Sequence, residues 1–437
     1  MQVFIHSYGC SANTADSEVL AGCLKQAGIQ LAQSEADADL LIYNTCAVKG
    51  PTENRIIDAL KNVPKNKKLI VAGCLPMISF ERLLRELRFD GAVGPSAGEG
   101  IVDVVKRVMA GERVVELAGL DSLPKLDLPR VQSSPVISVV PINFGCLGSC
   151  TYCCVVNARG HLRSYSIEEV AARVRNDVAC GFKEFWVTSQ DTGCYGRDLH
   201  TDLAELLLAL GSLPGDFRVR VGMMTPNMVT DMQNRLIESF KSPRIFKFLH
   251  LPVQSGDDNV LQYMRRFYTA AEFIGIVDSF RAKFRNLTLA TDVIVGFPGE
   301  TEEAFQNTLG LLEEVKPDVV NVSKFFARPK TVAAKMLDDL VAKEEIKRRS
   351  TVTAELVKSI SLEKNLRWVG WEGHVLVDEK GKFEGSWVGR NFAYKPVAIK
   401  SAENLLGKIM KVKVTEALPT YLKGTIVAEK SYNGMLK

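Results

Sequence analysis

The hydrophobic positions of the chain divide it into regions with different periodicities. In residues 1–117, the short apolar runs QVFIHSYGC, ADLLIYNTC and KLIVAGC alternate with segments whose apolar residues recur every three to four positions. Short apolar runs are typical of buried strands, and a 3.6-residue period is typical of helices. The pattern predicts an N-terminal Rossmann-like parallel α/β domain.

The same alternation resumes after residues 118–134, a segment without clear period that gathers Pro and Ser and that we interpret as a linker. Six strand candidates follow: VISVVPINFGC, EFWVTSQD, RVRVGMM, FKFLHLPVQSG, LATDVIVGFPGE and VVNVSKFFAR. Six successive strand–helix units favour a partial (βα)6 barrel of the TIM type over a second Rossmann sheet. We expect this barrel over residues 135–365, with the charged segment VAKEEIKRRSTVTAELVKSISLEKNL as a helix on its outside.

The last region, residues 366–437, has short alternating strands and turns, which predict a small β-barrel. It contains 12 Lys+Arg and 7 Asp+Glu, so its net charge of +5 exceeds the +4 of the whole chain. Cations beside an aromatic side chain suit an RNA backbone and a stacked base. The candidate RNA contacts are Arg390, Tyr394, Lys395, Lys411 and Lys413; the alternative is an ordinary solvated basic surface.

Composition restricts the chemistry of the cysteines. No apolar stretch approaches the roughly 18–20 residues that span a bilayer, and the N-terminus lacks the pattern of a secretory signal. We therefore expect a cytoplasmic protein with no membrane partner. Persistent disulfides are rare in that compartment, so clustered cysteines there more often bind metal or do redox chemistry.

Three cysteines, Cys146, Cys150 and Cys153, form a C-x3-C-x2-C pattern directly after the first barrel strand. We call them the loop cysteines. Three neighbouring thiolates can hold three irons of a [4Fe–4S] cluster and leave the fourth iron without a local ligand. A closed zinc site needs a fourth ligand. Cys154 is a poor candidate for it, because the side chains of adjacent residues such as Cys153 and Cys154 diverge. A cluster or zinc ion that only stabilises the fold is the alternative. Cys154 itself is expected to be exposed and oxidisable.

Three further cysteines, Cys10, Cys46 and Cys74, each follow a predicted parallel strand. We call them the strand-end cysteines. Ligands gather at the carboxyl ends of strands in open α/β sheets, so the fold can bring these thiols together. The alternative for each one is an ordinary buried cysteine. The remaining cysteines, Cys23, Cys180 and Cys194, are interpreted as structural.

The loop cysteines, with Tyr152 before the last of them, resemble the radical S-adenosylmethionine enzymes. Over essentially the whole chain, the sequence resembles the methylthiotransferases. The motifs that carry this resemblance are YGCSANTADSE, NTCAVKGPTENR, AGCLP, GCLGSCTYC, ARGHLRSYS, WVTSQDTGCYGRDL, RVGMMTPN, HLPVQSG and TDVIVGFPGET. The segments LDLPRVQSSPVISVVPINFGC and SQDTGCYGRDL are most similar to the archaeal and eukaryotic branch that acts on threonylcarbamoyladenosine in tRNA.

The resemblance implies specific roles. The loop cysteines would ligate a radical [4Fe–4S] cluster that chelates S-adenosylmethionine, and the strand-end cysteines would ligate an auxiliary [4Fe–4S] cluster. The substrate would be N6-threonylcarbamoyladenosine at position 37 in the tRNA anticodon loop, converted to its 2-methylthio derivative. A flavodoxin- or ferredoxin-type protein would supply electrons. The C-terminal region resembles the TRAM domain, an RNA-binding β-barrel.

Candidate contacts to S-adenosylmethionine are Tyr152, Gln190, Asp191 and Gln254. Polar side chains that merely fill the barrel interior are the alternative for these residues. Two other substrates stay open, isopentenyladenosine in tRNA and a ribosomal-protein aspartate, and so does a non-catalytic iron–sulfur RNA-binding or electron-carrier protein. The sequence departs from the family's R-P-G-T-P-A-A segment at ARPKTVAAKM, where Lys330 and Val332 replace Gly and Pro.

Overall fold

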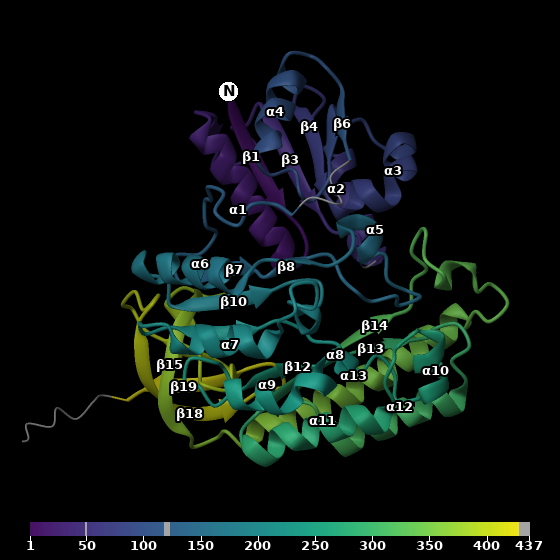
Figure 1. Cartoon of the computed structure of the whole chain (residues 1–437), viewed down its shortest axis with the longest axis vertical. Helices are drawn as coiled ribbons and strands as arrows, with labels where there is room; N and C mark the ends of the chain where they lie inside the picture. The colour runs from purple at the N-terminus through teal and green to yellow at the C-terminus, as the bar shows by residue number, and fades with distance from the viewer. Residues whose placement is uncertain (49, 118–122, 428–437) are drawn as a thin grey trace, which may run out of the picture.

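The computed structural model describes residues 1–48, 50–117 and 123–427. The predicted linker residues 118–122 and the last ten residues of the predicted C-terminal region lie outside the described part. Figure 1 shows a parallel α/β layer above a central strand–helix region, with a second set of strands at the side of that region.

The N-terminal region is a parallel six-stranded sheet with the strand order β2-β1-β3-β4-β5-β6. Its central strand β3 is buried along its whole length, as expected for a parallel strand covered by helices on both faces. The predicted Rossmann-like domain is therefore confirmed. The strands are β1 (Gln2–Ser7), β2 (Gln30–Leu31), β3 (Leu40–Thr45), β4 (Lys68–Gly73), β5 (Gly91–Val93) and β6 (Val114–Glu116), and the helices are α1 (Ser11–Gln26), α2 (Gly50–Lys61), α3 (Cys74–Glu86) and α4 (Ile101–Met109).

All six predicted barrel strands form. They make two parallel sheets, ordered β11-β10-β7 and β12-β13-β14, and a bridge between Val219 and Ile245 joins β11 to the segment that leads into β12. The strands are β7 (Ile137–Pro141), β10 (Glu184–Thr188), β11 (Arg218–Val221), β12 (Phe248–His250), β13 (Thr288–Val295) and β14 (Val319–Lys324). The result is the predicted partial barrel.

Helices cover the outside of this barrel and bury its largest core, which includes Phe185, Phe273 and Phe280. The expected outer helix exists as α13 (Lys343–Leu366), which packs against β14 and α12. The other helices of this region are α5 (Val155–Arg159), α6 (Ile167–Ala179), α7 (Leu203–Ser212), α8 (Pro226–Val229), α9 (Gln233–Ser239), α10 (Asp258–Tyr263), α11 (Ala270–Lys283) and α12 (Glu302–Val315); a small pair of strands, β8 (Asn143–Phe144) and β9 (Arg163–Ser164), precedes and follows α5.

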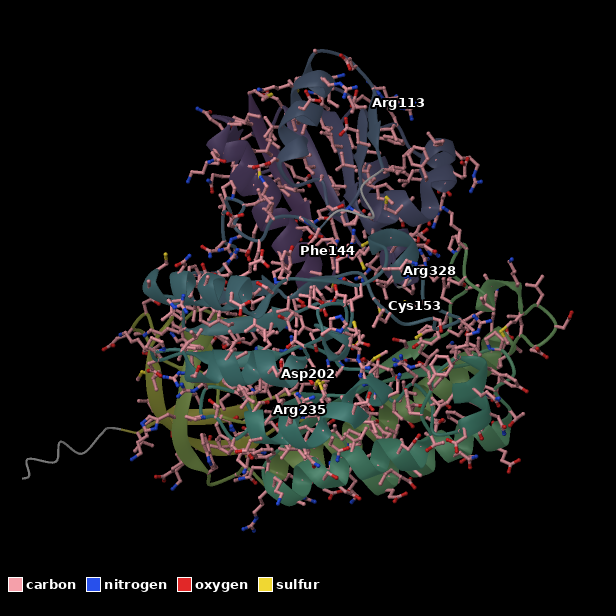
Figure 2. The ribbon with its side chains drawn as sticks, viewed as in Figure 1. Arg113, Phe144, Cys153, Asp202, Arg235 and Arg328 are labelled. Carbon is pink, nitrogen blue, oxygen red and sulfur yellow. The ribbon has the colours of Figure 1, made fainter. Side chains whose placement is uncertain are left out.

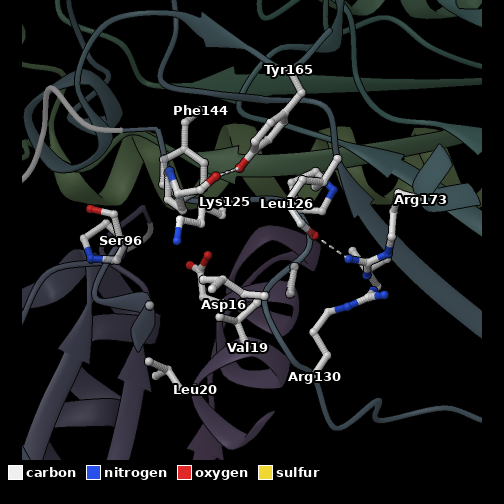
Figure 3. A pocket seen from close by; sticks show the side chains of 17 residues that line it. Asp16, Val19, Leu20, Ser96, Lys125, Leu126, Arg130, Phe144, Tyr165 and Arg173 are labelled. Atoms are coloured by element: carbon white, nitrogen blue, oxygen red, sulfur yellow. Dashed lines mark hydrogen bonds between the residues drawn. The ribbon is translucent and has the colours of Figure 1, made fainter. Parts of the chain in front are cut away.

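The described part of the linker packs between α1 and the barrel. Tyr165 donates from its hydroxyl to the carbonyl of Pro124 at 2.6 Å, and Arg173 donates to the carbonyl of Leu126 at 2.8 Å (Figure 3). Glu18 of α1 accepts from the backbone and the hydroxyl of Ser133. These contacts bind the N-terminal domain to the barrel.

The C-terminal strands close into a five-stranded barrel with the order β15-β16-β17-β19-β18, as predicted. The strands are β15 (Glu372–Lys380), β16 (Ser386–Arg390), β17 (Pro396–Lys400), β18 (Ile409–Ala417) and β19 (Leu422–Ile426). Within residues 1–48, 50–117 and 123–427, the structure contains no helix with the length and apolar character that crossing a bilayer requires.

The segment GRNFAYKP of the small barrel packs against the amino-terminal ends of the central barrel strands. The Tyr394 ring lies 4.9 Å from the Phe246 ring and 5.1 Å from the Phe248 ring, and its hydroxyl donates to Glu184 at 3.2 Å. Lys395 is 3% exposed and forms an ion pair with Asp318 at 2.8 Å.

This packing corrects the expectation that Arg390, Tyr394 and Lys395 are surface contacts for RNA. Arg390 forms ion pairs with Asp378 and Glu379, each at 3.0 Å. Cations and an aromatic ring in one short segment suggested RNA, but here they satisfy buried acids and fill an interface between domains.

Candidate functional site

The loop cysteines lie between β8 and α5, beyond the carboxyl end of β7. Contacts from distant segments hold this loop in place. Thr151 donates from its backbone to the carbonyl of Met264 at 3.1 Å and from its hydroxyl to the carbonyl of Tyr263 at 2.9 Å. Ala333 donates to the carbonyl of Thr151 at 2.9 Å. The loop is thus fixed by segments that follow β12 and β14.

The sulfur atoms of Cys146 and Cys150 border one small space at Gly148. A Cβ atom added at Gly148 would lie 3.2 Å from Sγ of Cys146 and 3.6 Å from Sγ of Cys150, so the glycine leaves room that any side chain would fill. The Gly148 amide donates to Cys146 at 3.1 Å, and the Val155 amide donates to Cys153 at 3.5 Å. Three thiols, amide donors to sulfur and a cleared space are the features that a cluster bound by three cysteines needs.

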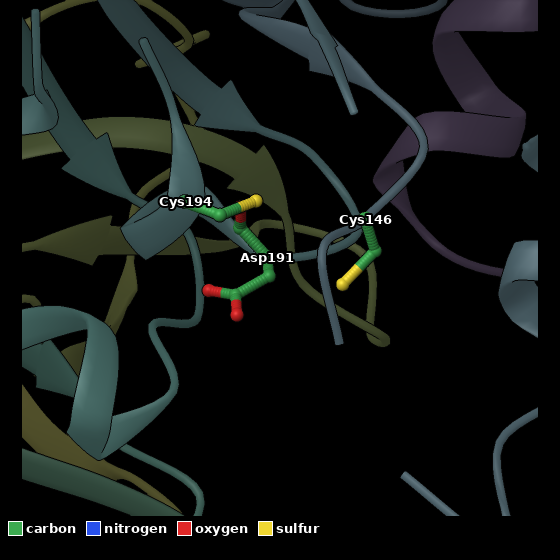
Figure 4. Close-up of side chains that lie close together, drawn as sticks. All are labelled: Cys146, Asp191 and Cys194. Carbon is green, nitrogen blue, oxygen red and sulfur yellow. The ribbon is translucent and has the colours of Figure 1, made fainter. Parts of the chain in front are cut away.

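Two buried residues on the neighbouring strand's loop lie beside Cys146 (Figure 4). Cys146, Asp191 and Cys194 each present one potential ligand atom, and these atoms lie within 4.8 Å of one another. Asp191 accepts from the amides of Gly193 at 2.9 Å and Thr225 at 3.1 Å, which fixes its carboxylate. A hydrogen bond with Cys194 lowers the pKa of Cys146.

Cys194, interpreted from the sequence as structural, has its sulfur atom within 4.8 Å of that of Cys146, so it is a further candidate ligand. Its sequence signal was available: it follows the second barrel strand by a few residues, as Asp191 does. Side chains at the carboxyl ends of adjacent barrel strands converge.

The other candidate cofactor contacts occupy the same end of the barrel. Tyr152 is partly buried and packs edge-on against Phe297, with ring centroids 6.4 Å apart. Gln190 carries a buried Oε1 that has no hydrogen-bond partner within the described chain. Gln254 has a left-handed backbone with φ +69° and pairs with Val293. Non-glycine residues in this conformation concentrate at functional sites, which keeps Gln254 a candidate.

The strand-end cysteines come from β1, β3 and β4, which are neighbours in the sheet. Cys10 precedes the first residue of α1, and Cys74 is the first residue of α3. Helix amino termini favour thiolates. A Cβ at Gly9 would lie 2.8 Å from Cβ of Cys46, so the backbone before Cys10 lies directly against Cys46. Electrostatic interactions link all three thiols.

Burial dominates the electrostatics of this second group. Burial raises the pKa of Cys46, and it raises the pKa of Cys74 to about 12, while Arg159 lowers both values. Burial therefore favours the neutral thiols of Cys46 and Cys74, and a bound metal would displace their protons. The expected gathering of these three cysteines is what the structure shows.

The two cysteine groups lie on the two sides of the junction between the N-terminal domain and the barrel, where α3, which begins at Cys74, packs against α5, which follows the loop cysteines. Figure 2 labels Phe144, Cys153 and Arg328 in this part of the molecule. Arg328 forms a buried ion pair with Glu53 of α2, and Ser11 shares a 2.6 Å hydrogen bond with Thr188 at the end of β10. Cys154 is 3% exposed and its Sγ lies 3.5 Å from the carbonyl oxygen of Ala47. The expectation of an exposed Cys154 is therefore wrong, because this thiol packs between the domains.

One further polar group lies inside the barrel and was missed in the sequence. His250 contacts Asp292 at 3.0 Å, and Asn321 donates to the same carboxylate at 2.7 Å. These residues belong to the adjacent strands β12, β13 and β14. The sequence could have indicated them, because in each strand a polar residue alternates with apolar residues and so lies on the opposite face of the strand.

Of the basic residues in the small barrel, Lys411 and Lys413 keep the accessible positions expected of them. Lys411 is partly exposed, and Lys413 is exposed and forms a 2.9 Å ion pair with Glu372. Val412 and Val414 point into the barrel core, on the strand face opposite Lys411 and Lys413.

Comparisons with known proteins cover all three regions. Residues 2–94 match an uncharacterized protein family, UPF0004; residues 140–312 match the radical SAM superfamily; and residues 367–427 match the TRAM domain. A solved radical S-adenosylmethionine methyltransferase from Kitasatospora setae aligns with a TM-score of 0.56 and 12% identity, covering 76% of this chain and 73% of its own. That likeness concerns the fold alone.

Curated relatives are similar over nearly the entire chain. A probable threonylcarbamoyladenosine tRNA methylthiotransferase from Pyrococcus horikoshii is 40% identical over 432 residues, which span 98% of this chain and 100% of that protein. A threonylcarbamoyladenosine tRNA methylthiotransferase from Mus musculus is 35% identical, over 98% of this chain and 74% of the mouse protein.

Proposed function

Because the chain belongs to the threonylcarbamoyladenosine tRNA methylthiotransferase family, we propose that it replaces the C2 hydrogen of N6-threonylcarbamoyladenosine at position 37 of tRNA with a methylthio group. The observation that carries this proposal is the presence of one three-cysteine group on each side of a domain junction, where α5 packs against α3. The loop cysteines would hold the cluster that radical chemistry needs. The strand-end cysteines would hold the cluster that delivers sulfur to the same carbon.

The radical SAM barrel implies one [4Fe–4S] cluster and S-adenosylmethionine. The loop cysteines and the space beside Gly148 fit such a cluster. When bound, this cluster and cofactor supply one-electron chemistry that can remove hydrogen from an unactivated carbon. The protein's own part is position: Thr151 fixes the loop, and Tyr152, Gln190, Asp191 and Gln254 are the side chains proposed to orient the cofactor.

We assign a second [4Fe–4S] cluster to the strand-end cysteines. Cys46 and Cys74 are buried and Cys10 is exposed, and two of the three thiols lie at helix amino termini. Three such thiols form a donor set with one position left for an exogenous sulfur ligand. Cys46, Cys74 and Cys154 are buried at this junction, so the protein shields this side of the site from bulk water.

The TRAM domain supports RNA binding, and we propose Lys411 and Lys413 as its contacts to the phosphate backbone. The target base is proposed to reach this domain junction, with the anticodon loop as the part of tRNA that is bound. A reducing protein of the flavodoxin or ferredoxin type and a cytoplasmic location stay predictions from the sequence.

The decisive experiment is anaerobic reconstitution with iron and sulfide, followed by reaction with S-adenosylmethionine, a reductant and tRNA that carries threonylcarbamoyladenosine. Nucleoside mass spectrometry should detect the 2-methylthio product. The variants Cys150→Ala and Cys46→Ala should abolish it, while Cys180→Ala, at an exposed cysteine, should retain it.

The same assay separates the alternatives. Methylthiolation of isopentenyladenosine tRNA or of a ribosomal-protein aspartate, with threonylcarbamoyladenosine unchanged, would contradict the proposed substrate. Failure to form 5′-deoxyadenosine from S-adenosylmethionine would favour a non-catalytic iron–sulfur protein.

A further inference from the structure

Arg159 lies at the end of α5, the short helix that follows the loop cysteines, and it interacts with the strand-end cysteines. It is the last residue of α5, which begins two residues after Cys153. Its side chain is 2% exposed and forms an ion pair with Asp16 of α1 at 2.5 Å. Its guanidinium carbon lies 5.1 Å from the centre of the Phe144 ring, on the strand before the loop cysteines. One side chain of the barrel domain thus reaches into the N-terminal domain.

The guanidinium is close enough to the strand-end cysteines to interact with them electrostatically. Arg159 interacts electrostatically with Cys10, Cys46 and Cys74. Its Nη2 atom donates to Asp16, but its Nη1 atom is buried and has no hydrogen-bond partner within the described chain. Leaving a buried polar group unpaired costs about 1–3 kcal/mol, and more for a charged group. A donor kept at that cost beside three thiols indicates an anionic ligand.

A cluster at this site would be such an anion. Three thiolates outweigh the charge of an oxidised [4Fe–4S] core, and an added sulfur ligand makes the assembly more negative. Burying a net negative charge requires a countercharge. Arginine suits this role because its planar fork can serve two acceptors at once, here Asp16 and a sulfur atom.

We propose that Arg159 is a positioning residue for the auxiliary cluster: its guanidinium balances the charge of the cluster and its Nη1 atom is the donor available to the cluster's sulfur atoms. This inference rests on the proposed second cluster. Because positive charge and hydrogen bonds to sulfur make a cluster easier to reduce, Arg159 raises the reduction potential of the cluster held by the strand-end cysteines. Asp16, which shares the guanidinium, has the opposite effect.

The test isolates one cluster. The full chain carrying Cys146→Ala, Cys150→Ala and Cys153→Ala holds only the strand-end site, and a redox titration followed by EPR gives its potential. Adding Arg159→Gln should lower the equilibrium constant for reduction tenfold or more, and each tenfold change corresponds to about 59 mV for one electron. Arg159→Lys should change the reduction potential much less than Arg159→Gln does, because lysine keeps the positive charge. Asp16→Asn should shift the potential upward.

A matched control is Arg130→Gln, which removes a partly buried ion pair with Asp177 at the same domain junction. Figure 3 shows Arg130 and Asp16 in the pocket between α1 and the linker. This variant should leave the potential unchanged. If Arg130→Gln and Arg159→Gln produced the same shift, or if Arg159→Gln and Asp16→Asn shifted it in the same direction, a general loosening of the junction would explain the data and the inference would be overturned.

Two other outcomes separate the inference from the function it rests on. A background variant that bound no cluster would contradict the second cluster itself, and the inference would fall with it. A background cluster whose potential was unaffected by Arg159→Gln would overturn the inference alone and leave the proposed function standing.

Discussion

Nη1 of Arg266 lies 3.3 Å from Sγ of Cys150, so a buried guanidinium donates to one of the loop cysteines. Its other nitrogen atoms are held by the Tyr268 hydroxyl at 3.1 Å and the carbonyl of Pro252 at 3.4 Å. Arg266 follows α10 and belongs to the segment whose backbone also holds Thr151. The same short segment therefore fixes the loop and places a positive charge beside it.

We predict that Arg266→Gln makes the radical cluster harder to reduce, because the variant removes both the charge and the hydrogen bond to sulfur. In a chain that lacks the strand-end cysteines, the equilibrium constant for reduction should fall roughly tenfold. An EPR-monitored titration checks this. Arg265→Gln, at the exposed neighbouring position, is the control and should behave like the parent. Equal potentials in the two variants would refute the role of Arg266.

Gly148 should tolerate no side chain when the loop binds its cluster. A Cβ there would approach Cys146 to 3.2 Å, in the space between two loop cysteines. Gly148→Ala is expected to lower iron retention at this site and the yield of 5′-deoxyadenosine by at least tenfold, with unchanged thermal unfolding of the cluster-free protein. Ser149→Ala, at an exposed neighbouring residue, should retain both. Full iron content in Gly148→Ala would show that the cluster lies elsewhere.

Tyr394 and the pair Lys411/Lys413 should separate stability from RNA binding. Tyr394→Ala removes a ring packed against Phe246 and Phe248, so it should destabilise the C-terminal barrel by about 2–3 kcal/mol, measured by calorimetry.

Substitution of both Lys411 and Lys413 by Gln should instead weaken tRNA binding and reduce the salt dependence of that binding by about two units of slope. Unchanged tRNA affinity and salt slope in the double variant would remove Lys411 and Lys413 as contacts.

The interface between the central barrel and the C-terminal barrel should weaken as the pH rises. Burial, and then the nearby Asp378 carboxylate, raise the pKa of Glu184 to about 8, while Trp186, Arg390 and Tyr394 oppose the shift. Burial also raises the pKa of Asp378. Between about pH 4.3, where an unfolded Glu titrates, and pH 8, the folded state binds more protons than the unfolded state. The contribution of Glu184 to the free energy of unfolding therefore falls as the pH rises through this range.

Glu184→Gln tests this account, because the neutral amide keeps the shape without the charge. Calorimetry at pH 6 and pH 8.5 should show a smaller drop in the unfolding temperature for the variant than for the parent. Glu205→Gln, which alters a surface ion pair with Arg235, should leave the parent's pH dependence intact. An identical drop for parent and Glu184→Gln would contradict the assignment.

The departure from the family's R-P-G-T-P-A-A segment has a measurable conformational cost. Lys330 stands where relatives have glycine, and its backbone is left-handed with φ +64°. That conformation costs an L-residue about 1–2 kcal/mol, which glycine avoids, although glycine loses more entropy on folding. Lys330→Gly should therefore raise the unfolding temperature by about 1–3 °C. A lower unfolding temperature would show that the lysine side chain compensates for the strain.

The sequence predicted the fold and the site correctly where the pattern of apolar residues alone defines a strand or a helix. Apolar runs ending in cysteine predicted that Cys10, Cys46 and Cys74 converge, because strand polarity alone brings strand ends together. It was misleading where partners come from distant segments. Lys395 looks like an RNA contact beside Tyr394, yet its partner Asp318 is 77 positions earlier in the chain. Cys154 and Cys194 likewise acquired their surroundings only through domain packing and neighbouring strands.

The central claim is that one chain holds two [4Fe–4S] clusters at a shared junction. Iron analysis with Mössbauer spectroscopy of anaerobically reconstituted protein tests it most directly. The account predicts about eight irons per chain in the parent and about four in each variant that lacks either the loop cysteines or the strand-end cysteines. About four irons in the parent, all lost when the loop cysteines alone are replaced, would contradict it.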